Sequence, residues 1–210
     1  MRQKRILLAD DHDVVRSGLR SLLQTQGWEV VAEADNGKDA IALIVEKTPD
    51  VAIIDYSLPL INGVEVTRSV KARQLDTEIL IFTMHDDDAL IRESFRAGAR
   101  GFLLKSEATP HLTAAVEALL AHKPYFTGIV SEKMLASYLS TNEEPSVLSA
   151  REREVIQLIS EGHTNNSVSK VLNLSAKTIE MYRATEMHKL TIKTTAGLVR
   201  YAIKNMLIEP

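Results

Sequence analysis

Short apolar runs alternate with amphipathic segments along the first 120 residues of the chain. Five of these runs are rich in aliphatic and β-branched residues and predict strands at 5–9, 30–34, 51–54, 79–83 and 101–104. The segments that follow them have helical periodicity and predict helices at 14–26, 37–47, 63–73, 87–97 and 108–121. Five units of this kind predict an α/β fold, a doubly wound five-stranded parallel sheet in the flavodoxin-like order 2-1-3-4-5.

The pattern changes after residue 122. Residues 123–145 contain Pro124, Gly128 and Pro145, with one predicted amphipathic helix, SEKMLASYL, in between. We expect this segment to be a linker between a first domain at 1–122 and a second at 146–210. The apolar face of the linker helix would carry Met134, Leu135, Tyr138 and Leu139, and it would need a surface to pack on.

Residues 146–210 predict a small all-α domain of four helices. Ser149 and Glu152 form a capping box before the first helix, and Gly162 ends it. Thr164 and Ser175 cap the next two, and Thr194 or Thr195 caps a fourth that runs to Met206. Two short helices joined by Asn173-Leu174-Ser175 are typical of a helix-turn-helix that reads DNA. A four-helix protein-binding module would show the same periodicity.

Composition and charge narrow the class of protein. The 210 residues include no cysteine, which excludes disulfide scaffolds and thiolate metal sites and fits a reducing cytosol. No signal peptide and no apolar run near 18 residues is present, so we expect a soluble, cytoplasmic protein without a membrane partner. The net charge of −3 divides into −5 for residues 1–122, −1 for 123–145 and +3 for 146–210. The basic end is therefore the candidate for nucleic acid.

Polar side chains stand where four of the five predicted strands end. Asp10 and Asp11 follow the first strand, Asp55 the third, Thr83 the fourth and Lys105 the fifth. Because parallel strand ends meet at one edge, these groups should converge in one crevice. Clustered carboxylates suit Mg²⁺, and Asp55 could then act as a nucleophile toward a phosphoryl group that Lys105 and Thr83 hold. Taken singly, each has a plain structural role as a cap, a strand residue or a solvated lysine.

The segments LLADDH, DVAIIDYSLPLINGVEV, ILIFTMHDD and ARGFLLK resemble the receiver domain of bacterial two-component response regulators. The resemblance implies that Asp55 accepts a phosphoryl group from a sensor histidine kinase. It also implies that Phe102, a strand aromatic, changes rotamer on activation. The Mg²⁺ ligands it implies are Asp10, Asp11, Asp55 and the backbone carbonyl of Ser57. His12 and His85 are interpreted as polar rim, and Asp86 to Asp88 as a helix cap.

The segment LSAREREVIQLISEGHTNNSVSKVLNLSAKTIEMYRATEMHKL resembles the LuxR-type output domain of NarL/FixJ response regulators. In that family the third helix of the domain reads DNA. The DNA-contacting residues carried over from it are Lys177, Thr178, Glu180, Met181 and Arg183, with Lys170 and Lys189 as phosphate contacts. Glu180 could accept a hydrogen bond from a cytosine amino group.

Several residues depart from the family pattern. Tyr182 and Thr185 replace a usual His and Asn, and Asn166-Ser167 replaces a Lys-Glu pair. Glu186 is the sharpest misfit because it shares a helix face with Ile179, Tyr182 and Leu190. A buried carboxylate there predicts a salt bridge, a shifted helix or a partner surface, and it would weaken the isolated domain or tune its assembly.

The expected function is a phosphorylation-switched, DNA-binding transcriptional regulator rather than an enzyme. Its expected partners are a histidine kinase, promoter DNA, a second copy of the chain on activation and RNA polymerase. The dimer would use the fourth and fifth predicted helices, or the first and fifth. Two alternatives stay open: a regulator that binds DNA without phosphorylation, and a receiver that acts as a phosphate sink or protein-interaction partner with a diverged output domain.

Overall fold

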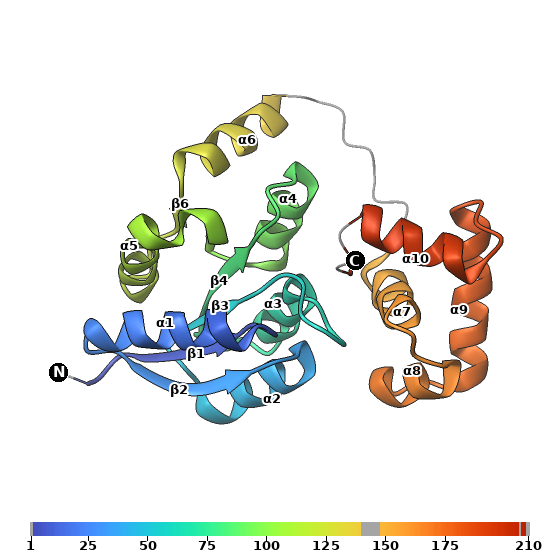
Figure 1. Ribbon diagram of the computed structural model, residues 1–210, viewed down its shortest axis with the longest axis horizontal. Helices are drawn as coiled ribbons and strands as arrows, with labels where there is room; N and C mark the ends of the chain where they lie inside the picture. The colour runs from blue at the N-terminus through green and yellow to red at the C-terminus, as the bar shows by residue number, and fades with distance from the viewer. Residues whose placement is uncertain (1, 140–147, 206, 209–210) are drawn as a thin grey trace. The chain divides into compact units, whose positions relative to one another are not determined.

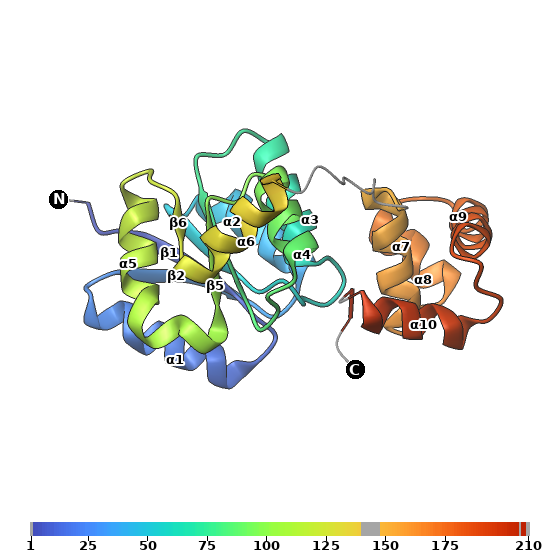
Figure 2. The same ribbon diagram turned by 90° about the horizontal axis from the view of Figure 1, so that it is seen from above.

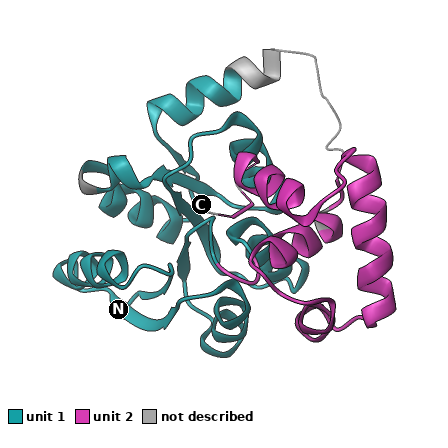
Figure 3. Ribbon diagram, turned by 45° about the vertical axis from the view of Figure 1, so that its right-hand side comes forward, with its two compact units in different colours: residues 1–58, 62–142 teal, residues 59–61, 143–210 magenta. Residues whose placement is uncertain are grey.

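The structure is a computed structural model that describes residues 2–139, 148–205 and 207–208. The chain divides into two compact units, residues 1–58 with 62–142 and residues 59–61 with 143–210 (Figure 3). Residues 140–145 of the predicted linker lie outside the described residues.

The first unit is built on one parallel sheet (Figure 1). Its order is β2-β1-β3-β4-β5-β6, and every neighbouring pair is parallel. The strands are β1 (Arg5–Ala9), β2 (Glu29–Ala34), β3 (Val51–Ile54), β4 (Glu78–Thr83), β5 (Gly101–Leu104) and β6 (Tyr125–Phe126). The predicted order of the first five strands is confirmed. All residues of β3, β4 and β5 are buried, as expected for a sheet that helices cover on both faces.

The predicted count of five strands is wrong because a sixth strand follows helix α5 (Ala108–Leu120). β6 has only two residues, which pair with Gly101 and Phe102 of β5, and Tyr125 N donates to Arg100 O at 2.9 Å. Two residues next to Pro124 carry no alternation that a sequence pattern can detect. The first part of the predicted linker is therefore an element of the sheet.

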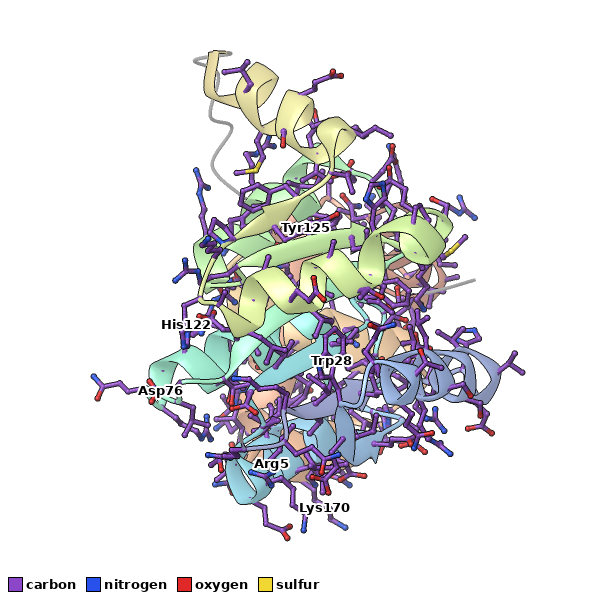
Figure 4. All side chains as sticks on the ribbon, turned by 90° about the vertical axis from the view of Figure 1, so that its left-hand side faces the viewer. Arg5, Trp28, Asp76, His122, Tyr125 and Lys170 are labelled. Atoms are coloured by element: carbon purple, nitrogen blue, oxygen red, sulfur yellow. The ribbon has the colours of Figure 1, made fainter. Side chains whose placement is uncertain are left out.

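Helices cover both faces of the sheet (Figures 1 and 2). Residues of α1 and α5 join one apolar cluster with β1, β3, β4 and β5, while α2, α3 and α4 pack side by side in sequence. Trp28 and Tyr125, both labelled in Figure 4, pack against that cluster. The helices are α1 (Asp13–Thr25), α2 (Gly37–Lys47), α3 (Gly63–Ala72), α4 (Asp88–Ala97), the 3₁₀ helix η1 (Lys105–Glu107), α5 (Ala108–Leu120) and α6 (Gly128–Leu139).

The α6 helix confirms the predicted linker helix and extends it by three residues toward the N-terminus. It packs against α4, so its surface is supplied by the first unit. The predicted apolar face is wrong at Leu135, whose side chain is 60% exposed. None of the described helices is long and apolar enough to span a membrane.

The second unit contains four described helices around its own apolar cluster. Ser149 and Glu152 form the predicted capping box, and Thr164, Ser175 and Thr194 each accept a backbone N–H at the start of the next helix. The helices are α7 (Ala150–Ser160), α8 (Asn165–Leu172), α9 (Ala176–Lys189) and α10 (Thr195–Lys204). α10 ends two residues before the predicted Met206, which lies outside the described residues.

Candidate functional site

The carboxyl edge of the sheet brings the predicted acidic side chains together. Asp10 and Asp55 follow β1 and β3, and their backbones stay in the ladder: Asp10 N donates to Ala34 O at 3.1 Å, and Asp55 N donates to Ala9 O at 2.7 Å. Both are buried, Asp10 at 1% and Asp55 at 2% exposure. The main chain therefore fixes the position of two carboxylates that burial deprives of water.

Lys105 connects these two carboxylates. It lies where β5 passes into η1, and its Nζ lies 2.7 Å from Asp10 Oδ2 and 2.9 Å from Asp55 Oδ2. The ammonium also lies 5.9 Å from the centre of the Phe82 ring, on the neighbouring strand. One ammonium thus contacts two buried carboxylates, on residues that follow one another along the chain at spacings of 45 and 50 positions.

The electrostatics of this trio tune the reactivity of Asp55. Burial raises the pKa of Asp55 to about 6, against the opposing effects of the Lys105 ammonium and its hydrogen bond. Burial alone would lower the pKa of Lys105, but the carboxylates of Asp55 and Asp10 raise it above its ordinary value. Near neutral pH, Asp55 is therefore a carboxylate next to a firmly held ammonium, as a nucleophile toward a phosphoryl group requires.

The turn after Asp55 leaves no room for a side chain at its end. Asn62 caps α3 by accepting from Glu65 N, and Gly63 N donates to Tyr56 O at 2.9 Å. A Cβ on Gly63 would lie 2.4 Å from the backbone oxygen of Asp55. The predicted Asn62-Gly63 turn is present, and the missing side chain allows α3 to begin directly against the Asp55 main chain.

Four residues at this edge could together hold a cation, and one of them, His12, is predicted from the sequence to be only part of the polar rim. Asp10, Asp11, His12 and Asp55 each offer an atom within 4.8 Å of the others. The His12 ring lies 2.8 Å from Asp11 Oδ1, whose charge raises the pKa of His12 above its ordinary value despite partial burial. The position of His12 directly after the acidic pair is the sequence signal for this role, and no second histidine is needed because three carboxylates surround the site.

Three carboxylates in this cluster are hard oxygen donors, and Lys105 balances only part of their charge. The residues therefore fit a divalent cation such as Mg²⁺. Ser57 N donates to Asp55 Oδ1 at 3.4 Å, which places the Ser57 main chain beside this carboxylate. The predicted role of the Ser57 carbonyl as a ligand stays a prediction.

Thr83 and Phe102 occupy neighbouring strands near the pocket. Both side chains are fully buried. Thr83 Oγ1 accepts a hydrogen bond from His85 N at 3.1 Å, so the hydroxyl is tied to the loop between β4 and α4. The adjacent acidic triplet behaves partly as predicted, because Asp87 caps α4 by accepting from Ala89 N and Leu90 N.

The second unit presents a mixed polar surface on α9. Lys177, Glu180 and Met181 are exposed, Met181 at 62%, and Thr178 is half-buried. Arg183 is half-buried and donates to Thr195 Oγ1 at the start of α10. Most of the predicted DNA-contacting residues thus reach solvent from one helix.

The two predicted phosphate contacts differ in their surroundings. Lys170 is exposed at the end of α8 and is labelled in Figure 4. Lys189 Nζ lies 2.6 Å from Glu152 Oε1. This ion pair joins the C-terminal end of α9 to the capping box at the start of α7. A phosphate would have to compete with Glu152 for Lys189.

Glu186 lies on the inner face of α9, as predicted from its spacing to Ile179. It is fully buried, and neither carboxylate oxygen has a hydrogen-bond partner among the described residues. The predicted salt bridge is therefore not formed within the described part of the chain, and α9 is continuous through residue 186. Full burial also keeps this carboxylate from contacting a partner surface in this conformation.

Comparisons with known proteins agree over both units. Residues 6–117 match the family model of the response regulator receiver domain, and residues 146–202 match that of bacterial regulatory proteins, luxR family. Oxygen regulatory protein NreC of Staphylococcus haemolyticus is 35% identical over 215 residues, covering 98% of this chain and 99% of that protein.

Two solved structures extend this agreement to the fold. A LuxR-family two-component response regulator from Aurantimonas sp. SI85-9A1 is 36% identical with a TM-score of 0.63, covering 66% of this chain and 100% of that one. A structure of two RcsB dimers bound to two parallel DNAs is 27% identical with a TM-score of 0.61, covering 95% of this chain and 98% of that one. The chain therefore belongs to the two-component response regulators of the LuxR type, which join a receiver domain to a helix-turn-helix and act as DNA-binding regulators of transcription.

Proposed function

We propose that phosphorylation of Asp55 switches the DNA binding of this regulator. The observation that carries the proposal is the convergence of Asp10, Asp55 and Lys105 at one sheet edge, with Lys105 Nζ 2.9 Å from Asp55 Oδ2. A purely structural ion pair between Lys105 and Asp55 would not require Asp10 as a second buried carboxylate on the same ammonium. It would also not require the further possible metal ligands, Asp11 and His12, beside it.

The phosphoryl donor is a phosphohistidine of a sensor kinase. A carboxylate oxygen of Asp55 forms a bond to phosphorus, while the bond from phosphorus to the donor imidazole nitrogen breaks and its electron pair returns to the ring. Lys105 holds one phosphoryl oxygen, and the Thr83 hydroxyl donates to another. Asp10, Asp11, Asp55 and the Ser57 carbonyl would hold Mg²⁺, which would supply positive charge to neutralise the phosphoryl oxygens.

The switch follows from the new charge at Asp55. As the Thr83 hydroxyl turns toward the phosphoryl group, the loop between β4 and α4 shifts, and Phe102 follows into the space released. The altered surface of the first unit favours a symmetric dimer, so that two copies of α9 reach two half-sites. The dimeric RcsB complex with DNA supports this arrangement by analogy.

The predicted DNA-contacting residues of α8 and α9 divide into two roles at the DNA. Lys177, Arg183 and Lys170 supply charge to phosphates, with Lys189 joining them if it leaves Glu152. Thr178, Glu180 and Met181 face the base edges, where Glu180 accepts from a cytosine amino group.

The kinase acts on this chain in the cytoplasm, and RNA polymerase is the further partner of the DNA-bound dimer.

The test captures sheared genomic DNA with the full chain, with and without beryllofluoride and Mg²⁺ as a mimic of the aspartyl phosphate. We expect specific sites to be recovered only with the mimic, and recovery to be lost in Asp55→Asn. Asp76→Asn is the matched control, because Asp76 is an exposed aspartate at the other edge of the sheet. Equal recovery without the mimic, or full activity of Asp55→Asn, would refute the phosphorylation switch.

A further inference from the structure

The strand and helix that follow α5 contact both of the structural elements that the proposed switch moves. β6 pairs with β5 in the register Phe102↔Phe126, and α6 packs against α4. The chain runs from β6 and α6 into the second unit, which resumes at residue 143.

The first link is aromatic. The Phe95 ring on α4 lies 4.9 Å from the Phe126 ring in an edge-to-face arrangement, and 6.5 Å from the ring of Phe102. Phe102 is fully buried in a close-packed region. A Phe102 ring that changes position therefore changes its contact with Phe95, which in turn contacts Phe126.

The second link is an ion-pair cluster on the surface. Lys133 Nζ lies 2.8 Å from Asp86 Oδ2 and 3.6 Å from Asp88 Oδ1, and it also donates to the backbone oxygen of Asp86. Asp86 belongs to the loop between β4 and α4, and Asp88 is the first residue of α4. Lys133 on α6 thus contacts both the backbone and the side chain of Asp86 in the loop, and the side chain of Asp88 at the start of α4.

The loop joins this cluster to the pocket. Thr83 Oγ1 accepts from His85 N, and the next residue is Asp86. When the Thr83 hydroxyl turns toward a phosphoryl group, the His85 N–H loses its acceptor and the loop has to find another arrangement. The Asp86 carbonyl that Lys133 holds lies one residue away, so the movement acts directly on the Lys133 contacts.

We propose that Lys133, with Asp86 and Asp88, is a latch that keeps α6 on α4 in the unphosphorylated protein and opens when Asp55 is phosphorylated. The inference rests on the proposed function, because it assumes that Thr83 and Phe102 respond to Asp55. Lys133 acts here as a positioning residue. Exposed ion pairs shift an equilibrium by about 1.5- to 5-fold, so the latch biases α6 without locking it.

The test measures the position of α6 directly in the full chain. Since the chain has no cysteine, Ala89→Cys on α4 and Glu132→Cys on α6 accept nitroxide labels at two exposed positions only. Electron double resonance gives the distance distribution between them. We expect one narrow distribution without beryllofluoride and Mg²⁺, and a broader, longer one with them. Binding of the mimic is read separately by fluorine NMR.

Lys133→Gln in the labelled protein is expected to broaden the distribution without the mimic and to raise DNA affinity in that state by about 1.5- to 5-fold. Lys123→Gln is the matched control, because it removes the same charge from an exposed position just before β6. Asp86→Asn with Asp88→Asn should reproduce Lys133→Gln from the other side of the cluster.

Two results overturn the latch: an unchanged distance distribution with fluorine NMR showing the mimic bound, or an unchanged distribution in Lys133→Gln. Failure of the proposed function has a different signature. In that case fluorine NMR shows no bound mimic, or DNA binding does not respond to it, while Lys133→Gln still releases α6.

Discussion

Two buried carboxylates, one in each unit, have opposite surroundings. Asp55 is 2% exposed and pairs with the Lys105 ammonium at 2.9 Å. Glu186 is 0% exposed, and neither of its oxygens has a hydrogen-bond partner among the described residues. Burial raises both pKa values, that of Asp55 to about 6 and that of Glu186 to about 8. Burial alone therefore does not distinguish a reactive carboxylate from an inert one.

The difference lies in the cation. Lys105 favours the charged form of Asp55 near neutral pH, which is the form that the proposed phosphoryl transfer needs. The Glu152 carboxylate raises the pKa of Glu186 further, and Lys189, which lowers it by less, is paired with Glu152. With a pKa of about 8, Glu186 is protonated at neutral pH, and we expect its burial without a partner to destabilise the second unit, whereas Lys105 offsets the cost of burying Asp55.

Removing the unpaired carboxylate should have the largest effect on stability. Glu186→Leu is expected to raise the free energy of unfolding of the second unit by about 3–5 kcal/mol at pH 7, because an unsatisfied polar group is replaced by an apolar one. Hydrogen exchange of the α7 and α9 amides in the full chain measures this.

The control for that variant is Glu180→Leu on the exposed face of the same helix, which should change stability by about 0.5 kcal/mol or less. If Glu186→Leu is no more stable than Glu180→Leu, and dimerisation and DNA affinity are also unchanged, the carboxylate has an unrecognised partner.

The next effect is a pH dependence confined to the second unit. The pKa of Glu186 is about 8 in the fold and near 4.5 when unfolded, so the folded form binds a proton that the unfolded form has released. Stability is therefore full below pH 4.5 and decreases toward pH 8, by about 1 kcal/mol per pH unit and about 3 kcal/mol from pH 5 to 8.

Glu186→Gln provides the comparison, since an amide keeps the shape and does not titrate in this range. Hydrogen exchange, corrected for the effect of pH on the exchange rate, gives the unfolding free energy of the unmodified chain and of Glu186→Gln at each pH. The difference between the two should show the full decrease with pH. A slope that persists unchanged in Glu186→Gln would assign it to another group.

The smallest expected effect concerns the geometry around Asp55. Gly63→Ala places a methyl group 2.4 Å from the Asp55 backbone oxygen, and the nearest atoms are main chain. We expect a loss of about 1–3 kcal/mol of stability in the first unit and about tenfold weaker binding of beryllofluoride. Chemical denaturation and fluorine NMR report the two quantities.

Gly18→Ala is the control for this variant, because nothing lies within 4 Å of a Cβ at that helical position and alanine favours a helix. It should leave beryllofluoride binding unchanged and the first unit equally or slightly more stable. Equal effects of the two variants would mean that the turn after Asp55 can move without disturbing the carboxylate.

The sequence patterns predicted most of the fold. β1, β3 and β5 begin and end at the predicted residues, and the other two predicted strands differ by one residue at one end. Such accuracy is possible because a strand buried on both faces is a continuous apolar run between polar turns. β6 was missed because two residues give no run, and its pairing with β5 depends on where α5 ends in space.

The candidate site divides in the same way. The positions of Asp10, Asp55 and Lys105 follow from the sheet topology alone, so their convergence was predictable. The ion pairs of Lys133 with Asp86 and of Lys189 with Glu152 join residues 47 and 37 positions apart on different helices or loops. Pairing at such separations leaves no periodic signal, and for Glu186 the burial was predictable while the absence of a partner was not.

The two-residue strand β6 has a practical consequence for where this protein can be divided. A fragment ending at residue 122 would leave the hydrogen-bonding edge of β5 open at Gly101 and Phe102 and would remove the Phe126 ring from Phe95. Open sheet edges promote association between copies, so such a fragment should aggregate or dimerise artificially. Truncation after α6 keeps β6 paired with β5 and the Phe126 ring against Phe95, so an isolated receiver of this protein should be made to residue 139.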